Sequence, residues 1–225
     1  SFQANLHERY GFLTESINSN ELKGKIIRKE GTANFHPQWS NDGEKFAYLS
    51  NVGKDFISQT DLHIYTLDGG NNDIIAENVF SSPSWSSSDE KIYYTKKSKV
   101  DNKGSRWFDL YVYSFLDEKE DRLTKGARAF SPLILPGDSL LAYLATNDGT
   151  QNLFLLNLNS REFQQITNFD DGRQIMNLSF DPKDNLLMFD NLESHFRNIS
   201  AISLKDTSFV NLIAVPEWDE RDITS

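Results

Sequence analysis

The side chains that could perform acid–base or nucleophilic chemistry at neutral pH are few in this sequence. There is no cysteine, and the only histidines are His7, His36, His63 and His195. A serine hydrolase needs a nucleophile on a strained turn, often within Gly-x-Ser-x-Gly, beside a histidine base. No such motif is present, and none of the histidines has a recognisable catalytic context. We therefore predict that this chain has no catalytic residue of its own.

Two short oxygen-rich segments are the only candidates for a metal site. They are Asn147-Asp-Gly-Thr-Gln-Asn152 and Asn168-Phe-Asp-Asp-Gly172, and carboxylate and carbonyl oxygens of this kind can bind Ca²⁺. The same residue types are also preferred in ordinary turns for backbone reasons. Motifs such as His-Glu-x-x-His or an EF-hand loop are absent. We favour turns, predict no cofactor, and keep calcium as the alternative.

Aromatic and arginine residues in two longer segments are better candidates for binding. Segments 51–60 and 96–108 contain Phe56, Arg106, Trp107 and Phe108. Exposed aromatic and arginine side chains on loops are frequent anchors of binding surfaces. Arg128 and Arg173 lie in two further connecting segments. Together these residues predict a surface that binds a protein or peptide, unless Trp107 only begins a strand and folds inward.

A repeated pattern indicates how the chain positions these residues. Residues 35–50 alternate apolar and polar positions on both sides of Asp42-Gly43, which is typical of a β-hairpin. Copies of the pattern are anchored at positions 39, 85, 134 and 180, which are 46, 49 and 46 residues apart. A near-constant period of this length is typical of repeat architectures. Each hairpin is followed by an apolar run that begins with Asp or Asn (61–67, 109–115, 152–158 and 198–204), and then by a short last run (73–75, 122–124, 165–167 and 211–213).

Four short strands in each repeat predict an all-β propeller built of four-stranded antiparallel blades. The predicted blades are residues 35–79, 80–129, 130–174 and 175–214. Residues 1–34 are expected to form a partial blade with strands at 10–14 and 25–27, and residues 215–225 to lead into a further blade. In such a fold, segments 51–60 and 96–108 lie on the same face as the connections between blades. From these incomplete ends we expect the chain to be part of a longer protein.

His36 begins an innermost strand of this predicted propeller, beside Pro37. The equivalent residues of the other repeats, Ser82, Ser131 and Asn177, are also polar. These side chains either contact a ligand at the channel mouth or only bond to backbone groups where strands begin. The large apolar residue at each anchor position, such as Trp39, is expected to pack between blades.

Composition narrows the range of partners. The formal net charge is −10 and the isoelectric point about 4.9, which disfavours binding to nucleic-acid phosphates. No apolar run approaches the ~18 residues of a membrane-spanning helix. The oligomeric state is not indicated by any pattern.

The repeats resemble the WD-like repeats of the TolB-type propeller. The resemblance rests on Phe35-His-Pro-Gln-Trp-Ser-Asn-Asp-Gly-Glu-Lys-Phe-Ala-Tyr48, Asp109-Leu-Tyr-Val-Tyr113 and Arg122-Leu-Thr124. It implies a periplasmic or otherwise extracytoplasmic, non-catalytic module that binds a protein or peptide. Similar blades occur in propellers of prolyl-oligopeptidase-, dipeptidyl-peptidase- and tricorn-like peptidases, so one alternative is a docking or gating propeller of a larger peptidase. A metal-dependent small-molecule propeller enzyme is a third reading.

Overall fold

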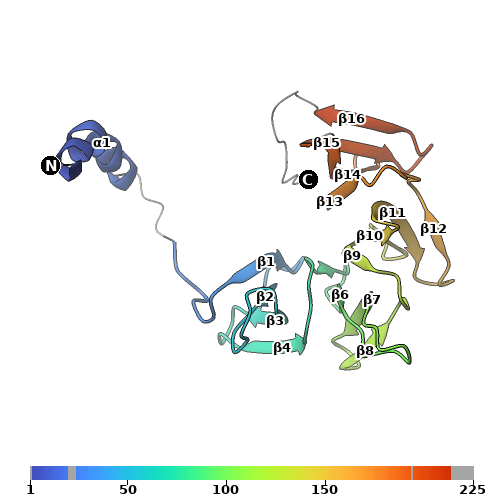
Figure 1. Ribbon diagram of the computed structural model, residues 1–225. Coiled ribbons are helices and arrows are strands. Elements are labelled where there is room, and N and C mark those ends of the chain that lie inside the picture. Colours follow the sequence, from blue (N-terminus) through green and yellow to red (C-terminus); the bar gives the residue numbers. More distant parts are fainter. Residues whose placement is uncertain (1, 20–23, 194, 214–225) are drawn as a thin grey trace. The chain divides into compact units, whose positions relative to one another are not determined.

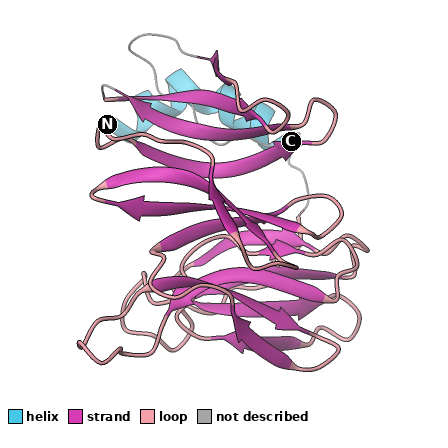
Figure 2. Ribbon diagram, turned by 90° about the vertical axis from the view of Figure 1, so that its right-hand side faces the viewer, coloured by secondary structure: helices cyan, strands magenta, loops and turns pink. Residues whose placement is uncertain are grey.

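The computed structural model describes residues 2–19, 24–193 and 195–213. The chain divides into two compact units, Ser1–Glu30 and Gly31–Ser225. The first unit contains the helix α1 (Phe2–Ser19), and all sixteen strands of the described residues belong to the second (Figures 1 and 2). Within the described residues, no helix is long and apolar enough to cross a lipid bilayer.

The two strands predicted near the N-terminus are wrong. Tyr10 and Thr14 both lie within α1, and residues 24–30 contain no strand. In α1 the apolar residues Phe2, Leu6 and Leu13 recur at spacings close to the helical period, and only a window longer than five residues reveals this. The connection predicted at 215–225 lies outside the described residues.

The second unit consists of four antiparallel sheets, each of which pairs four consecutive strands in chain order. This confirms the all-β propeller prediction. The sheets, referred to below as blades one to four, are β1 (Asn34–Trp39), β2 (Lys45–Ser50), β3 (Asp61–Thr66) and β4 (Asn72–Ala76); β5 (Ser84–Trp85), β6 (Lys91–Lys97), β7 (Phe108–Ser114) and β8 (Lys119–Arg122); β9 (Ala129–Ile134), β10 (Leu140–Asn147), β11 (Thr150–Asn157) and β12 (Phe163–Gln165); and β13 (Gln174–Asp181), β14 (Leu186–Glu193), β15 (Phe196–Ser203) and β16 (Phe209–Ile213).

Consecutive blades pack against one another (Figure 1). Their first strands β1, β5, β9 and β13 are in contact in that order. Each interface has its own hydrophobic core. The core between blades one and two contains Leu49 and Tyr94, the core between blades two and three contains Leu110 and Tyr143, and the third core contains Leu144 and Phe189. Burying a side chain of this size stabilises the fold by roughly 1.5–3 kcal/mol. These interfaces explain why the strands of blades two and three are apolar on both faces.

Carboxylates in the hairpin turns join neighbouring blades. Asp89 of blade two accepts hydrogen bonds from the backbone N–H groups of Asn41 and Asp42 at 2.9 and 3.0 Å. Asp138 of blade three accepts in the same way from the backbone N–H of Ser87 at 3.0 Å. In blade three the residue equivalent to Ser87 is Pro136, which has no N–H to donate. The turn clamp, as we call it, therefore joins blades one to two and two to three.

The anchor residues pack between blades with one exception. Trp85 is buried and donates its indole N–H to the carbonyl oxygen of Gln38 in blade one at 3.0 Å. Ile134 and Phe180 pack against the cores of the next two interfaces. Trp39 is 56% exposed instead, because it lies on the face of blade one that points away from blade two.

Candidate functional site

A buried carboxylate at the start of β7 fixes the connection that leaves blade two. Asp109 Oδ1 accepts hydrogen bonds from Thr124 Oγ1 and from the backbone N–H of Ala127, both at 2.9 Å. Its Oδ2 forms an ion pair with Arg122 at 2.5 Å. Asp109 is completely buried, so these partners replace the water that it loses. The segment that carries Arg128 is thereby held against the blade.

Asn152, at the equivalent place in blade three, does the same without a charge. Its Oδ1 accepts from Thr167 Oγ1 at 2.9 Å and from the backbone N–H of Phe169 at 2.7 Å, and its amide donates to the Phe169 carbonyl oxygen at 3.0 Å. In blades two and three, the Asp or Asn that begins the third run therefore binds the Thr of the last run, a contact that we call the exit clamp. These threonines lie just after the last strands β8 and β12, which end about two residues earlier than predicted.

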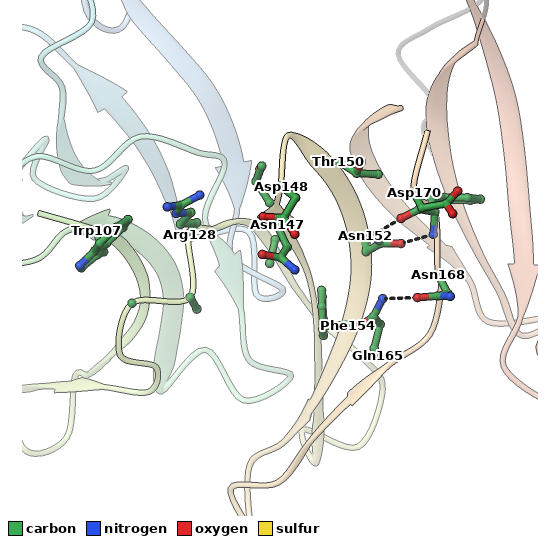
Figure 3. Close-up of a pocket in the computed structure, with 15 residues that line it drawn as sticks. Trp107, Arg128, Asn147, Asp148, Thr150, Asn152, Phe154, Gln165, Asn168 and Asp170 are labelled. Atoms are coloured by element: carbon green, nitrogen blue, oxygen red, sulfur yellow. Dashed lines mark hydrogen bonds between the residues drawn. The ribbon is translucent and has the colours of Figure 1, made fainter. Parts of the chain in front are cut away.

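A pocket of about 700 Å³ lies between the two exit clamps (Figure 3). Its walls come from the residue before β7, the β8–β9 connection, the β10–β11 hairpin, the end of β12 and the β12–β13 connection. The lining residues are Trp107, Gly126, Ala127, Arg128, Ala145, Thr146, Asn147, Asp148, Thr150, Asn152, Phe154, Gln165, Asn168, Phe169 and Asp170. Loops between second and third strands and connections between blades meet here, as the sequence predicted for a propeller.

Trp107 and Arg128 form one wall of the pocket. The guanidinium carbon of Arg128 lies 4.8 Å from the centroid of the Trp107 ring. The indole N–H of Trp107 donates to Asp101 Oδ2 at 3.2 Å. The pKa of Asp101 is lowered, mainly by the backbone N–H of Ser105 and also by this indole. Arg128 has a left-handed backbone with φ of 51°, which costs free energy in a residue other than glycine.

Polar side chains dominate the rest of the pocket. Gln165 donates from Nε2 to the Thr167 carbonyl oxygen at 2.7 Å and to Asn168 Oδ1 at 3.3 Å. Asp148 and Asp170 line the pocket from the β10–β11 turn and the β12–β13 connection. Beneath them, Tyr143 stacks on Phe154 with ring centroids 5.5 Å apart, and burial raises the pKa of Tyr143 to about 12.

The other predicted binding residues lie outside the pocket lining. Arg173 is adjacent: it stacks on Phe169 at 4.4 Å and pairs with Asp171 at 2.9 Å. Arg106 is exposed beside Trp107. Phe108 packs against the Phe80 ring at 5.0 Å. Phe56 is 64% exposed on the β2–β3 loop of blade one. The structure therefore joins Trp107 with Arg128 and leaves Phe56 on a different blade.

His36 occupies a bulge of the innermost strand, away from this pocket. His36, Ser131 and Asn177 have φ values of 51°, 50° and 54°, and each lies at a break in the pairing of its strand. Asn177 donates to Asp190 Oδ2 at 2.7 Å, and the Ser131 backbone N–H donates to Ser81 Oγ at 3.0 Å. Desolvation lowers the pKa of His36. At Ser131 and Asn177, therefore, hydrogen bonds within the protein accompany the bulge.

The two segments considered for calcium converge on the pocket. Asn147, Asp148 and Asp170 are lining residues. The side-chain oxygen of Asn152, by contrast, already accepts the two hydrogen bonds of the exit clamp. The described residues contain no group of three or more His, Cys, Asp or Glu side chains placed to hold a metal ion. Phe154 and Gln165 were missed, because their sequence signal is that of ordinary strand residues.

No family model and no curated protein matches the chain, whereas solved structures resemble it in fold. A putative TolB from Agrobacterium tumefaciens is 17% identical with a TM-score of 0.64, and the match covers 78% of this chain and 63% of that one. TolB from Acinetobacter baumannii is 13% identical with a TM-score of 0.69, covering 85% and 46%. A puromycin-hydrolyzing peptidase from Mycobacterium tuberculosis is 13% identical with a TM-score of 0.66, covering 86% and 32%.

The chain thus spans less than two thirds of the length of either TolB structure. At these identities the similarity concerns the fold and carries no activity with it. It agrees with the four meander sheets and their order in the chain. By its fold, this protein is a β-propeller similar to that of TolB.

Proposed function

We propose that this chain is a non-catalytic interaction module that binds a protein or peptide segment in the pocket between blades two and three. The pocket itself carries the proposal: at about 700 Å³ it is within the usual size range of ligand sites. An indole ring and a guanidinium form one wall, and amides and carboxylates form the others. Aromatic and arginine side chains supply contact area, while amides and carboxylates match the hydrogen-bonding groups of a peptide backbone.

Both exit clamps support a binding role because they make the site rigid before a ligand arrives. Asp109 and Asn152 hold the two connections that form opposite sides of the pocket. A preformed site loses less conformational entropy on binding than a mobile one. The resemblance to TolB-type propellers supports the further proposal that the protein acts in the periplasm or another extracytoplasmic compartment.

The test is selection of peptides from a displayed random library on the purified chain, followed by affinity measurements on synthetic copies by fluorescence anisotropy. Asn147→Trp fills the pocket from an exposed position, and Asn159→Trp adds the same ring at an exposed turn of the same blade outside the pocket. We expect selected peptides to lose binding to Asn147→Trp and to keep it with Asn159→Trp. Equal binding to the wild type and Asn147→Trp would contradict the proposal.

A second candidate is the substrate-docking or gating propeller of a larger extracytoplasmic peptidase. It is favoured by the similarity to the puromycin-hydrolyzing peptidase, of which the chain covers 32%. The natural protein would then exceed 25.8 kDa and react with a fluorophosphonate probe for active serines, whereas residues 1–225 alone would not. A natural protein of this mass without labelling would exclude this candidate.

A further inference from the structure

We infer that the pocket recognises a carboxylate group of its ligand and that Arg128 is the residue that selects it. This inference rests on the proposed function and names the chemistry of the ligand. The carboxylate belongs either to an Asp or Glu side chain or to the C-terminus of a peptide; both present the same two oxygens.

The orientation of Arg128 leaves its hydrogen-bonding edge available. The guanidinium carbon lies over the Trp107 ring, 4.8 Å from its centroid. A guanidinium has five N–H donors around its edge, in a fork that matches two carboxylate oxygens. Within the described part of the chain, none of these donors forms a hydrogen bond or an ion pair. The contact with Trp107 therefore positions the guanidinium and leaves its N–H donors for a ligand.

The residue before Arg128 is fixed by a hydrogen bond, and the backbone of Arg128 itself has an unfavourable conformation. The exit clamp binds the N–H of Ala127, the preceding residue, to the buried carboxylate of Asp109 at 2.9 Å. Arg128 follows with φ of 51°. Surrounding structure that maintains such strain is a frequent feature of binding sites. Here it places a solvent-exposed arginine at the lining of the pocket.

The charges of the lining disfavour a doubly charged acid more than a singly charged one. Among the described residues that line the pocket, Arg128 is the only cationic one, and Asp148 and Asp170 are the acidic ones. A group with two negative charges, such as a phosphate monoester, would be repelled by both carboxylates. A peptide carboxylate carries one charge, and the N–H groups beside it suit the aspartates. Arg173, the neighbouring cation, is already paired with Asp171.

The test is an NMR titration of the ¹⁵N-labelled chain, with the indole N–H signal of Trp107, assigned by Trp107→Phe, as the reporter. The probes are acetyl-Gly-Asp-Gly-amide, acetyl-Gly-Gly-Gly with a free C-terminus, the neutral acetyl-Gly-Asn-Gly-amide, and inorganic phosphate. We expect saturable shifts with one or both carboxylate peptides. The neutral peptide and phosphate should bind at least about tenfold more weakly, since hydrogen bonds between charged groups are stronger than those of neutral groups.

Two variants and a matched control assign the effect to Arg128. Arg128→Gln should bind the Asp and Asn peptides equally, and Arg128→Lys, which keeps the charge but not the fork, should lie between it and the wild type. Arg161→Gln makes the same change at another left-handed arginine, with φ of 65°, outside the pocket. It should bind as the wild type does, and dispersed amide spectra would confirm that all three variants fold.

The outcomes separate the two proposals. Equal affinity of the wild type for the Asp and Asn peptides, or no effect of Arg128→Gln, would overturn the carboxylate inference and leave peptide binding in place. Tighter binding of phosphate would also overturn it. If no peptide shifts the Trp107 signal, and library peptides bind Asn147→Trp as tightly as the wild type, the proposed function is contradicted as well.

Discussion

The guanidinium of Arg128 lies over the ring of Trp107 at 4.8 Å, although neither residue belongs to a strand. Trp107 precedes β7, and Arg128 precedes β9. The contact therefore joins the long β6–β7 loop to the connection between blades two and three. At this contact the two loops together form one wall of the pocket.

This stacking contact should have a measurable coupling energy. In a cycle of Trp107→Leu, Arg128→Leu and the double variant, we expect a coupling of about 0.5–1 kcal/mol, which is the usual size of an exposed cation–π contact. The free energy of unfolding of each variant in urea supplies the four values. Strictly additive single effects would mean that the stack contributes no stability.

The exit clamp of blade two contains an ion pair that the exit clamp of blade three lacks. We expect that two substitutions can introduce the same ion pair in blade three. Blade two uses Asp109 with Arg122, and blade three has Asn152 and Gln165 at the same places. Asn152→Asp alone should cost about 3 kcal/mol or more, because it buries a carboxylate without a cation. Asn152→Asp with Gln165→Arg should recover most of that loss.

Urea unfolding of the two single variants and the double variant measures this recovery. A control is Asp121→Asn on the exposed face of β8, which should change the free energy of unfolding by less than about 0.5 kcal/mol. If the added arginine at 165 gives no recovery, the exit clamp does not have equivalent geometry in the two blades.

The turn clamp between blades one and two should also contribute to stability. Asp89→Gly keeps the left-handed backbone that Asp89 adopts at φ of 59° but removes the acceptor for Asn41 and Asp42. We expect a loss of about 1–3 kcal/mol, since two backbone N–H groups lose their partner. Asn185→Gly, at the same φ in blade four, is the control and should be nearly neutral. Equal effects of the two changes would contradict the clamp.

Much of the fold could be predicted from the sequence, because each blade repeats one local pattern. The Trp39-to-Tyr48 hairpin alone indicates two strands and their turn. The run that begins at Asp109 is apolar on both faces, and this predicted a strand covered on both sides. The N-terminal helix was missed because Tyr10–Thr14 is a short apolar run, and a run of five residues does not distinguish a strand from a helix.

The site was predictable only in part. Trp107 and Arg128 stood out as an aromatic and a cation on loops of a propeller face, and the structure places them together. Phe154 and Gln165 could not be found, because the pocket exists only where the ends of β11 and β12 meet a neighbouring connection. Contacts between blades depend on how sheets pack, and the period of the repeat does not specify them.

Alkaline pH should destabilise the protein through its buried tyrosines. Burial raises the pKa of Tyr143 to about 12 in the folded state, whereas an unfolded tyrosine ionises near pH 10. The unfolded state thus loses its proton first, so the stabilising contribution is complete below about pH 10 and is lost as the pH rises toward 12. Burial also raises the pKa values of Tyr93 and Tyr111.

Absorbance at 295 nm during a titration, followed beside circular dichroism, measures this effect. Ionisation of the buried tyrosines should coincide with unfolding, while exposed tyrosines titrate earlier. Tyr143→Phe should retain more stability than the wild type between about pH 10 and 12 and match it at pH 7. An identical decline in both proteins would show that Tyr143 is not a source of the pH dependence.

The turn clamp also gives the array of blades a direction, with a consequence for gene duplication. Each clamp runs from an N–H of one blade to a carboxylate of the next, and Gly43 stands in blade one where blades two and three have Asp89 and Asp138. A second copy of blade two inserted after the original would supply a carboxylate to one neighbour and N–H groups to the other. A copy of blade one would supply only the N–H groups. Blade two is therefore the unit that tandem duplication can multiply while every turn clamp is preserved.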